Sequence, residues 1–202
     1  MTTMTTPPDA GRAAPADPTT VDLVHAPGPG RPLHELTRPI VDAPTAREAL
    51  GALCDALGAV LAVDDLAVTL GGVDEPVLRL ATTRRASRAV SIQRELGAGP
   101  HVTAGARGMV VVVDDLGSAS RWPRVAAALR REGARAVAAV PLTFNGHHLG
   151  CASAYATVAR AFGSAEVHAA CRLADTAAAD LCYRHRALLD GVVDFRTSRV
   201  TV

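Results

Sequence analysis

Lysine is absent from this chain of 202 residues. All 21 basic residues are arginine, and with 20 acidic residues they leave a net charge of +1. This balance lacks the concentrated positive charge of a nucleic-acid-binding surface. Exclusive use of arginine, together with abundant alanine and glycine, indicates GC-rich bacterial coding bias more than selection for bidentate hydrogen bonding. We therefore expect no nucleic-acid partner.

Aromatic residues make up 3% of the sequence, although hydrophobic residues make up 49%. The core must therefore consist of Ala, Val and Leu, whose small volumes favour close packing of helices on a sheet. No run approaches the roughly 18 apolar residues of a membrane helix, and the N-terminus lacks the basic and apolar blocks of a signal peptide. We expect a cytoplasmic protein without a membrane partner.

Cysteine is scarce and shows no CxxC spacing. Cys54, Cys151, Cys171 and Cys182 all lie among apolar residues, where a free thiol behaves as a small hydrophobic group. This pattern is typical of a reducing compartment. It also predicts no structural metal site.

Residues 1–43 hold eight of the 13 prolines and show no apolar period. We expect a disordered tail there, a folded domain over 44–190 and a short C-terminal tail over 191–202. The Thr45-x-x-Glu48 capping box predicts that a helix begins at about residue 45 and runs to 62.

A last helix of about 26 residues should begin at Ser164, and its apolar stripe is longer than one sheet face can cover. We therefore expect a homodimer through the first and last helices. The predicted contacts are Leu50, Leu57, Leu181, Leu188 and Leu189.

Between these helices the pattern predicts five strands. Runs at 67–70 and 76–81 form one hairpin, and Asn145-Gly146 joins 135–143 to 147–156 in another. The fifth strand covers 109–113, and shorter helices are expected at 84–96 and 122–131. This order predicts an α/β (α+β) fold: a five-stranded mixed, mainly antiparallel sheet, with the terminal helices on one face and short helices or loops over the other.

Four segments occur in a characteristic order: ELGAGP at 95–100, VVVDDLGSASRWPRV at 111–125, GARAVAAVPL at 133–142 and GHHLGCASAYA at 146–156. Together they resemble GAF domains of actinobacterial signalling proteins, of the kind that often precedes an ANTAR RNA-binding domain. The resemblance covers about 44–190 and implies a GAF/PAS-like sensor. Only about a dozen residues follow Gly191, too few for an ANTAR domain. We therefore expect the signal to leave through a dimer partner or a separate effector protein, or else the protein is a degenerate sensor that has lost its effector.

Many relatives carry cysteine directly after the Gly-x-Gly-Pro turn, where this chain has His101. The side chain of His101 has three interpretations: a hydrogen-bond donor in a pocket, a haem ligand or a solvated loop residue. The identity of any cofactor stays unknown.

Alternation along 149–156 separates small from larger side chains. Gly150, Ala152, Ala154 and Ala156 should face the terminal helices, and Leu149, Cys151, Ser153 and Tyr155 should face a cavity. That cavity would lie beneath a 97–107 loop and Trp122, with His101 reaching in. Alternatively, Tyr155 fills a small core.

No catalytic motif is apparent, so we expect a sensor that is not an enzyme. It would bind a small molecule, dimerise, or do both. The alternatives are a structural or interaction GAF domain without a ligand, and an enzyme resembling the thiol-dependent free methionine sulfoxide reductases. His147 and His148 point to opposite faces of a strand, so they cannot join Cys151 around one metal ion.

Overall fold

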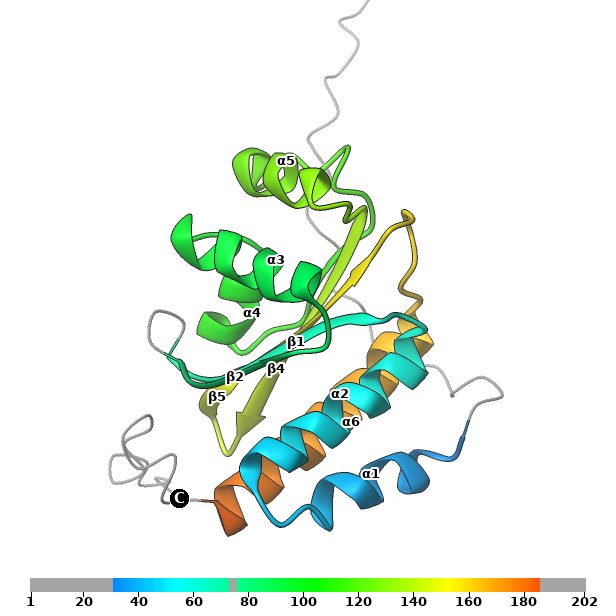
Figure 1. The fold of residues 1–202 in the computed structure, drawn as a ribbon, viewed down its shortest axis with the longest axis vertical. Helices are drawn as coiled ribbons and strands as arrows, with labels where there is room; N and C mark the ends of the chain where they lie inside the picture. Colours follow the sequence, from blue (N-terminus) through cyan, green and yellow to red (C-terminus); the bar gives the residue numbers. More distant parts are fainter. Residues whose placement is uncertain (1–30, 73–75, 186–202) are drawn as a thin grey trace, which may run out of the picture.

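A five-stranded sheet separates two layers of helices in the computed structural model, which describes residues 31–72 and 76–185 (Figure 1). The strand order is β2-β1-β5-β4-β3, and every pairing is antiparallel, so the expected mixed sheet is antiparallel throughout. The strands are β1 (Asp65–Gly71), β2 (Pro76–Ala81), β3 (Val111–Val113), β4 (Ala136–Phe144) and β5 (His147–Ala156).

One face of the sheet is covered by α2 (Ala46–Leu61) and α6 (Ser164–Arg184), and α1 (Leu33–Val41) packs against these two helices on the side away from the strands (Figure 1). Helix α2 begins at the predicted capping box: the Glu48 N–H donates to Thr45 Oγ1 at 3.2 Å, and the Thr45 hydroxyl donates to the Glu48 carboxylate at 2.7 Å. Ala152, Ala154 and Ala156 of β5 lie in the core beneath this layer, as alternation along the strand predicts.

The segment before residue 44 corrects one expectation, because α1 belongs to the folded domain. Its Leu36 and Ile40 side chains are buried in the main core, and the helix packs against α2 and α6. The sequence did not predict this helix because proline disfavours helix interiors: Pro32 precedes its first turn and Pro39 lies inside it. Residues 1–30 and 191–202 lie outside the described residues.

The predicted dimer contacts also need correction. Leu50, Leu57 and Leu181 are at most 1% exposed, because they fill the core between the helices and the sheet. The apolar stripe of α6 is thus used within the chain and is not available to a second copy. Leu188 and Leu189 lie outside the described residues.

The opposite face is covered by α3 (Arg84–Glu95), α4 (Pro100–Arg107) and α5 (Pro123–Arg131). Helix α4 stands where the sequence suggested a loop, and it packs against β3, β4, β5 and α3. Its residues are mostly small and show no helical period of apolar side chains, so the sequence did not predict this helix. Pro100 nevertheless occupies the first helical position, where proline is common. None of the helices in 31–72 and 76–185 combines the length and apolar character needed to cross a membrane.

Leu149 lies on the helix face with the main core, and not on the cavity face that simple alternation assigned to it. The register of β4 and β5 shifts here, since Leu142 pairs with Gly150 whereas Thr143 pairs with His148. The extra residue reverses the side-chain direction locally.

Replacing Ile40 with Ala should lower the free energy of unfolding by about 2 to 5 kcal/mol, because a fully buried side chain leaves a cavity. Val41→Ala on the same helix is the matched control, since Val41 is 39% exposed. We expect the control to stay within about 0.5 kcal/mol of the wild type. Urea unfolding followed by circular dichroism measures both, and equal stabilities would show that α1 contributes nothing to the core.

Candidate functional site

Strand β5 presents Cys151, Ser153 and Tyr155 on the face that lies beneath α3 and α4, and each is at most 1% exposed. Thr69 of β1 pairs directly with Cys151 across the ladder, so its hydroxyl lies on the same face. Three polar groups and one thiol are therefore buried together in the centre of the sheet.

Gly99 allows α4 to begin directly above these groups. Its φ of +120° is strained for other residues, and a Cβ there would lie 2.5 Å from the Oε1 atom of Gln93. Pro100 then starts the helix, which places His101 in the first turn, facing the sheet.

The His101 side chain is 2% exposed and both of its ring nitrogens are engaged. Nδ1 lies 2.7 Å from Ser153 Oγ, and Nε2 lies 3.0 Å from Thr69 Oγ1. His101 is therefore a buried hydrogen-bonding residue and not a solvated one. With both nitrogens occupied, the ring has no free position for a haem iron.

Gln93 of α3 links α4 to β5. Its Oε1 accepts from the His101 backbone N–H at 2.9 Å, and its Nε2 donates to the Tyr155 hydroxyl at 2.9 Å and to the Ala89 carbonyl at 3.2 Å. The side chain is completely buried. Replacing it would leave the buried His101 N–H without this acceptor, at about 1 to 3 kcal/mol, and would remove a donor from the Tyr155 hydroxyl.

Burial keeps the ionisable members of this cluster uncharged. Desolvation, with a smaller contribution from the charge of Arg94, lowers the pKa of His101 from 6.5 to about 4. Burial raises the pKa of the Cys151 thiol to about 12 and also raises that of Tyr155. The site is thus a neutral hydrogen-bonding network, suited to hold a polar group but without a thiolate or a charged acid or base.

Four of the five residues predicted to line a pocket therefore come together: His101, Cys151, Ser153 and Tyr155. The fifth, Trp122, is half-buried at the start of α5 and packs beside the cluster that contains Cys151. Its ring faces the Arg121 guanidinium at 4.7 Å and takes no part in the network. The Tyr155 hydroxyl satisfies a buried side-chain amide, which agrees with the alternative in which Tyr155 fills a core.

Sequence reasoning missed Gln93 and Thr69. Gln93 lies on the buried stripe of α3 with Ala86, Ala89 and Val90, and a polar residue on such a stripe is a detectable signal. Thr69 shares its strand face with Ala67, which could have been found from alternation once the pairing with β5 was known.

The remaining cysteines lie on the other side of the sheet, Cys54 on α2 and Cys171 and Cys182 on α6. Burial raises the pKa of Cys54 to about 12 and that of Cys171 to about 11. Among the residues that the structure describes, no three His, Cys, Asp or Glu side chains are grouped to hold a metal ion.

Residues 45–181 match the family described as GAF domain, which covers more than half of the chain. The chain belongs to the GAF domain family. No curated protein matches the sequence.

Solved structures share this GAF fold at low sequence identity. A domain of a two-component sensor histidine kinase protein from Sinorhizobium meliloti 1021 is 20% identical with a TM-score of 0.56, over 74% of this chain and 99% of that one. Free methionine-R-sulfoxide reductase from Neisseria meningitidis, solved with its substrate, is 18% identical with a TM-score of 0.57, over 77% and 89%. The GAF domain of a phosphoenolpyruvate-protein phosphotransferase from Coxiella burnetii is 19% identical with a TM-score of 0.55, over 80% and 95%.

The pKa of His101 predicts a pH-dependent stability. Because the folded-state pKa of about 4 lies below the ordinary 6.5, the unfolded chain binds more protons between these values. The contribution of His101 to the free energy of unfolding is complete above about pH 6.5 and is lost as the pH falls towards 4. At about 1.4 kcal/mol per pKa unit, the loss is roughly 3 kcal/mol.

His101→Asn should remove this component, and His34→Asn on the exposed surface of α1 is the matched control. Urea unfolding at a series of pH values measures the slopes. We expect the slope between pH 4 and 6.5 to decrease in His101→Asn and to stay at the wild-type value in His34→Asn. An unchanged slope in His101→Asn would contradict the buried, neutral state of the ring.

Proposed function

We propose that this GAF domain is a non-enzymatic sensor that binds a small polar molecule beneath α4 and passes the signal to a partner protein. The observation that supports this proposal is the network of Thr69, Gln93, His101, Ser153 and Tyr155. These side chains come from β1, α3, α4 and β5, and they meet between the sheet and a short helix. Small-molecule sites typically combine apolar walls with a few convergent polar groups of this kind.

In the closed arrangement the polar groups satisfy one another. A bound molecule would take over these hydrogen bonds, and α4 would move outward to admit it. The molecule must therefore offer both donors and acceptors, because an apolar occupant would leave His101 and Gln93 unsatisfied. Ligand binding and displacement of α4 are then one coupled equilibrium.

Strand β5 offers a route for the signal. Ser153 and Tyr155 face the network, while the intervening Ala154 belongs to the core between the sheet and the layer of α2 and α6. A shift of β5 would thus alter the packing of α2 and α6. In this proposal these helices, on their outward surfaces, contact either a second copy of the chain or a separate effector.

Absence of catalysis is part of the proposal. Cys151 lies beside the network, with its Sγ atom 3.8 Å from Ser153 Oγ, and burial keeps it as a thiol of low reactivity. A free methionine-R-sulfoxide reductase is among the similar solved structures, but at 18% sequence identity the similarity indicates a shared fold and not a shared activity.

A second candidate function is an interaction domain without a ligand. It is favoured by the completeness of the network, since every one of its five side chains is at most 5% exposed and hydrogen-bonded within the chain. The two candidates differ in whether the closed arrangement ever opens.

Native mass spectrometry of the freshly purified full chain tests the sensor. We expect a bound small molecule above the chain mass of 20.8 kDa, and the same spectrum reports whether the chain forms a dimer. Ser153→Ala removes a polar group of the network and should weaken retention.

Ser164→Ala is the matched control, because Ser164 is exposed at the start of α6, on the other side of the sheet. We expect it to retain the molecule. If the wild type carries nothing, even after incubation with a bacterial metabolite extract, the interaction domain becomes the better proposal.

Reduction of free methionine sulfoxide should be undetectable with dithiothreitol as the electron donor. The physical reason is the raised thiol pKa of Cys151, which leaves almost no thiolate near neutral pH. An assay of methionine formation measures the reductase activity, and Cys54→Ser is the control for thiol chemistry at another buried cysteine. Turnover that persists in Cys54→Ser and disappears in Cys151→Ser would overturn the non-enzymatic proposal.

A further inference from the structure

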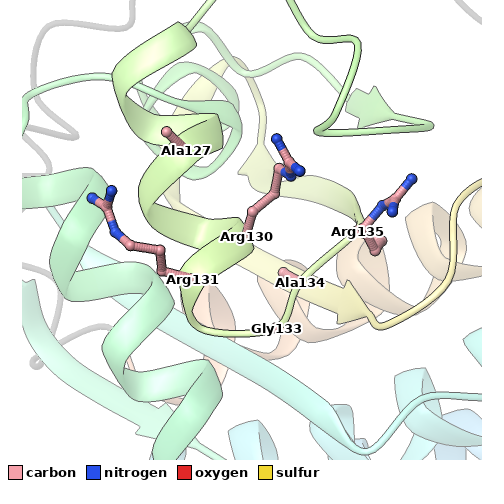
Figure 2. Close-up of a pocket in the computed structure, with 6 residues that line it drawn as sticks. All are labelled: Ala127, Arg130, Arg131, Gly133, Ala134 and Arg135. Carbon is pink, nitrogen blue, oxygen red and sulfur yellow. The ribbon is translucent and has the colours of Figure 1, made fainter.

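A solvent-open cleft of about 460 Å³ lies at the junction of α5 and β4, away from the buried network. Three arginines and three small residues line it (Figure 2): Ala127, Arg130, Arg131, Gly133, Ala134 and Arg135. No acidic side chain is among these lining residues. The cleft volume falls within the range of small-molecule sites.

The turn from α5 into β4 brings the arginines together. Gly133 has a φ of +90°, which reverses the chain within a short distance and is strained for other residues. In Figure 2 the Arg130 and Arg135 side chains extend in the same direction from either end of this turn, whereas Arg131 lies on the other side of the helix end. The first two can therefore approach one bound group together.

The negative end of the α5 dipole does not oppose an anion strongly here. The N–H groups of Glu132, Gly133 and Ala134 donate to the carbonyls of Ala128, Arg130 and Leu129. These bonds satisfy three carbonyls of the last turn of α5, which reduces the partial negative charge at this helix end.

Asp115 holds one of the arginines in place. The Arg135 Nε and Nη2 atoms donate to its two carboxylate oxygens at 3.2 and 3.0 Å. A hydrogen bond from the Gly117 backbone, followed by that of Arg135 itself, lowers the pKa of Asp115, so this anchor stays ionised.

The chain itself offsets only part of the positive charge of the cleft. Asp115 pairs with Arg135 and also attracts Arg130 electrostatically, and neighbouring Glu132 is paired with Arg88 at 3.3 Å. Within 31–72 and 76–185, no carboxylate comes within ion-pair distance of Arg130 or Arg131. Positive charge is therefore left to attract an anion.

We propose that this cleft is a second ligand site, which binds the phosphate group of a small phosphorylated molecule between Arg130 and Arg135. Guanidinium groups match phosphate oxygens through paired, charge-assisted hydrogen bonds. The bonds of Arg135 to Asp115 use its Nε and Nη2 atoms, so its Nη1 atom is the donor left for the anion beside Arg130. A small molecule fits better than a nucleic acid because the positive charge is confined to one turn and the whole chain carries only +1. The cleft shares no lining residue with the network beneath α4.

Isothermal titration calorimetry of the full chain with inorganic pyrophosphate, at physiological salt, tests the proposal. We expect saturable binding with a dissociation constant below about 1 mM. Arg130→Gln should weaken it about tenfold, and Arg130→Lys should restore only part of the affinity because lysine keeps the charge but not the fork.

Arg124→Gln is the matched control, since it removes the same charge from the exposed first turn of α5. It should bind pyrophosphate like the wild type, and thermal melts verify that all variants are folded. Equal weakening by Arg124→Gln would show unspecific charge attraction and overturn the site. So would absence of saturable binding, or binding of an RNA oligonucleotide in place of pyrophosphate.

Discussion

The central strand β5 imposes the constraint on which the rest of the molecule depends. It pairs with β1 on one side and β4 on the other, and its alternate residues serve two different layers. Ala152, Ala154 and Ala156 have almost no bulk, so the layer of α2 and α6 can approach the sheet closely. Ser153 and Tyr155 face the other way and require hydrogen-bond partners, because polar groups buried without partners are costly. One ten-residue strand therefore fixes both the packed layer and the polar layer.

The polar layer is held in a single arrangement because its groups lie far from water. His101 is kept in its neutral form, so one ring nitrogen donates and the other accepts, and Ser153 and Thr69 must orient their hydroxyl groups to match. The Tyr155 hydroxyl must likewise be oriented to accept the hydrogen bond from Gln93 Nε2. The network is consequently cooperative: removing one member leaves its neighbours unsatisfied, whereas a ligand with matching groups could replace several members at once.

Most of the architecture could be predicted from the sequence, because capping and turn chemistry act locally. The Thr45-Glu48 box and the Asn145-Gly146 turn placed α2 and the β4-β5 hairpin correctly. The errors arose where tertiary contacts decide the structure. Helix α1 contains proline and depends on the core around Ile40, and α4 has too little apolar pattern to be seen without the sheet beneath it. The site could be predicted in part: β5 alternation identified Ser153 and Tyr155, but their partner Gln93 is distant in sequence and depends on how α3 packs.

The two candidate sites are joined through the backbone of β5. The Arg135 N–H, at the edge of the arginine cleft, donates at 2.7 Å to the carbonyl of Ala156, the residue that follows Tyr155. An anion that repositions Arg135 therefore acts on the same strand that carries Ser153 and Tyr155. Coupling between the sites requires that this strand, or α4 above it, has two arrangements whose equilibrium both ligands bias. If it has, linkage makes the effect reciprocal: the anion changes the affinity beneath α4 by the same factor as the buried ligand changes the affinity of the cleft.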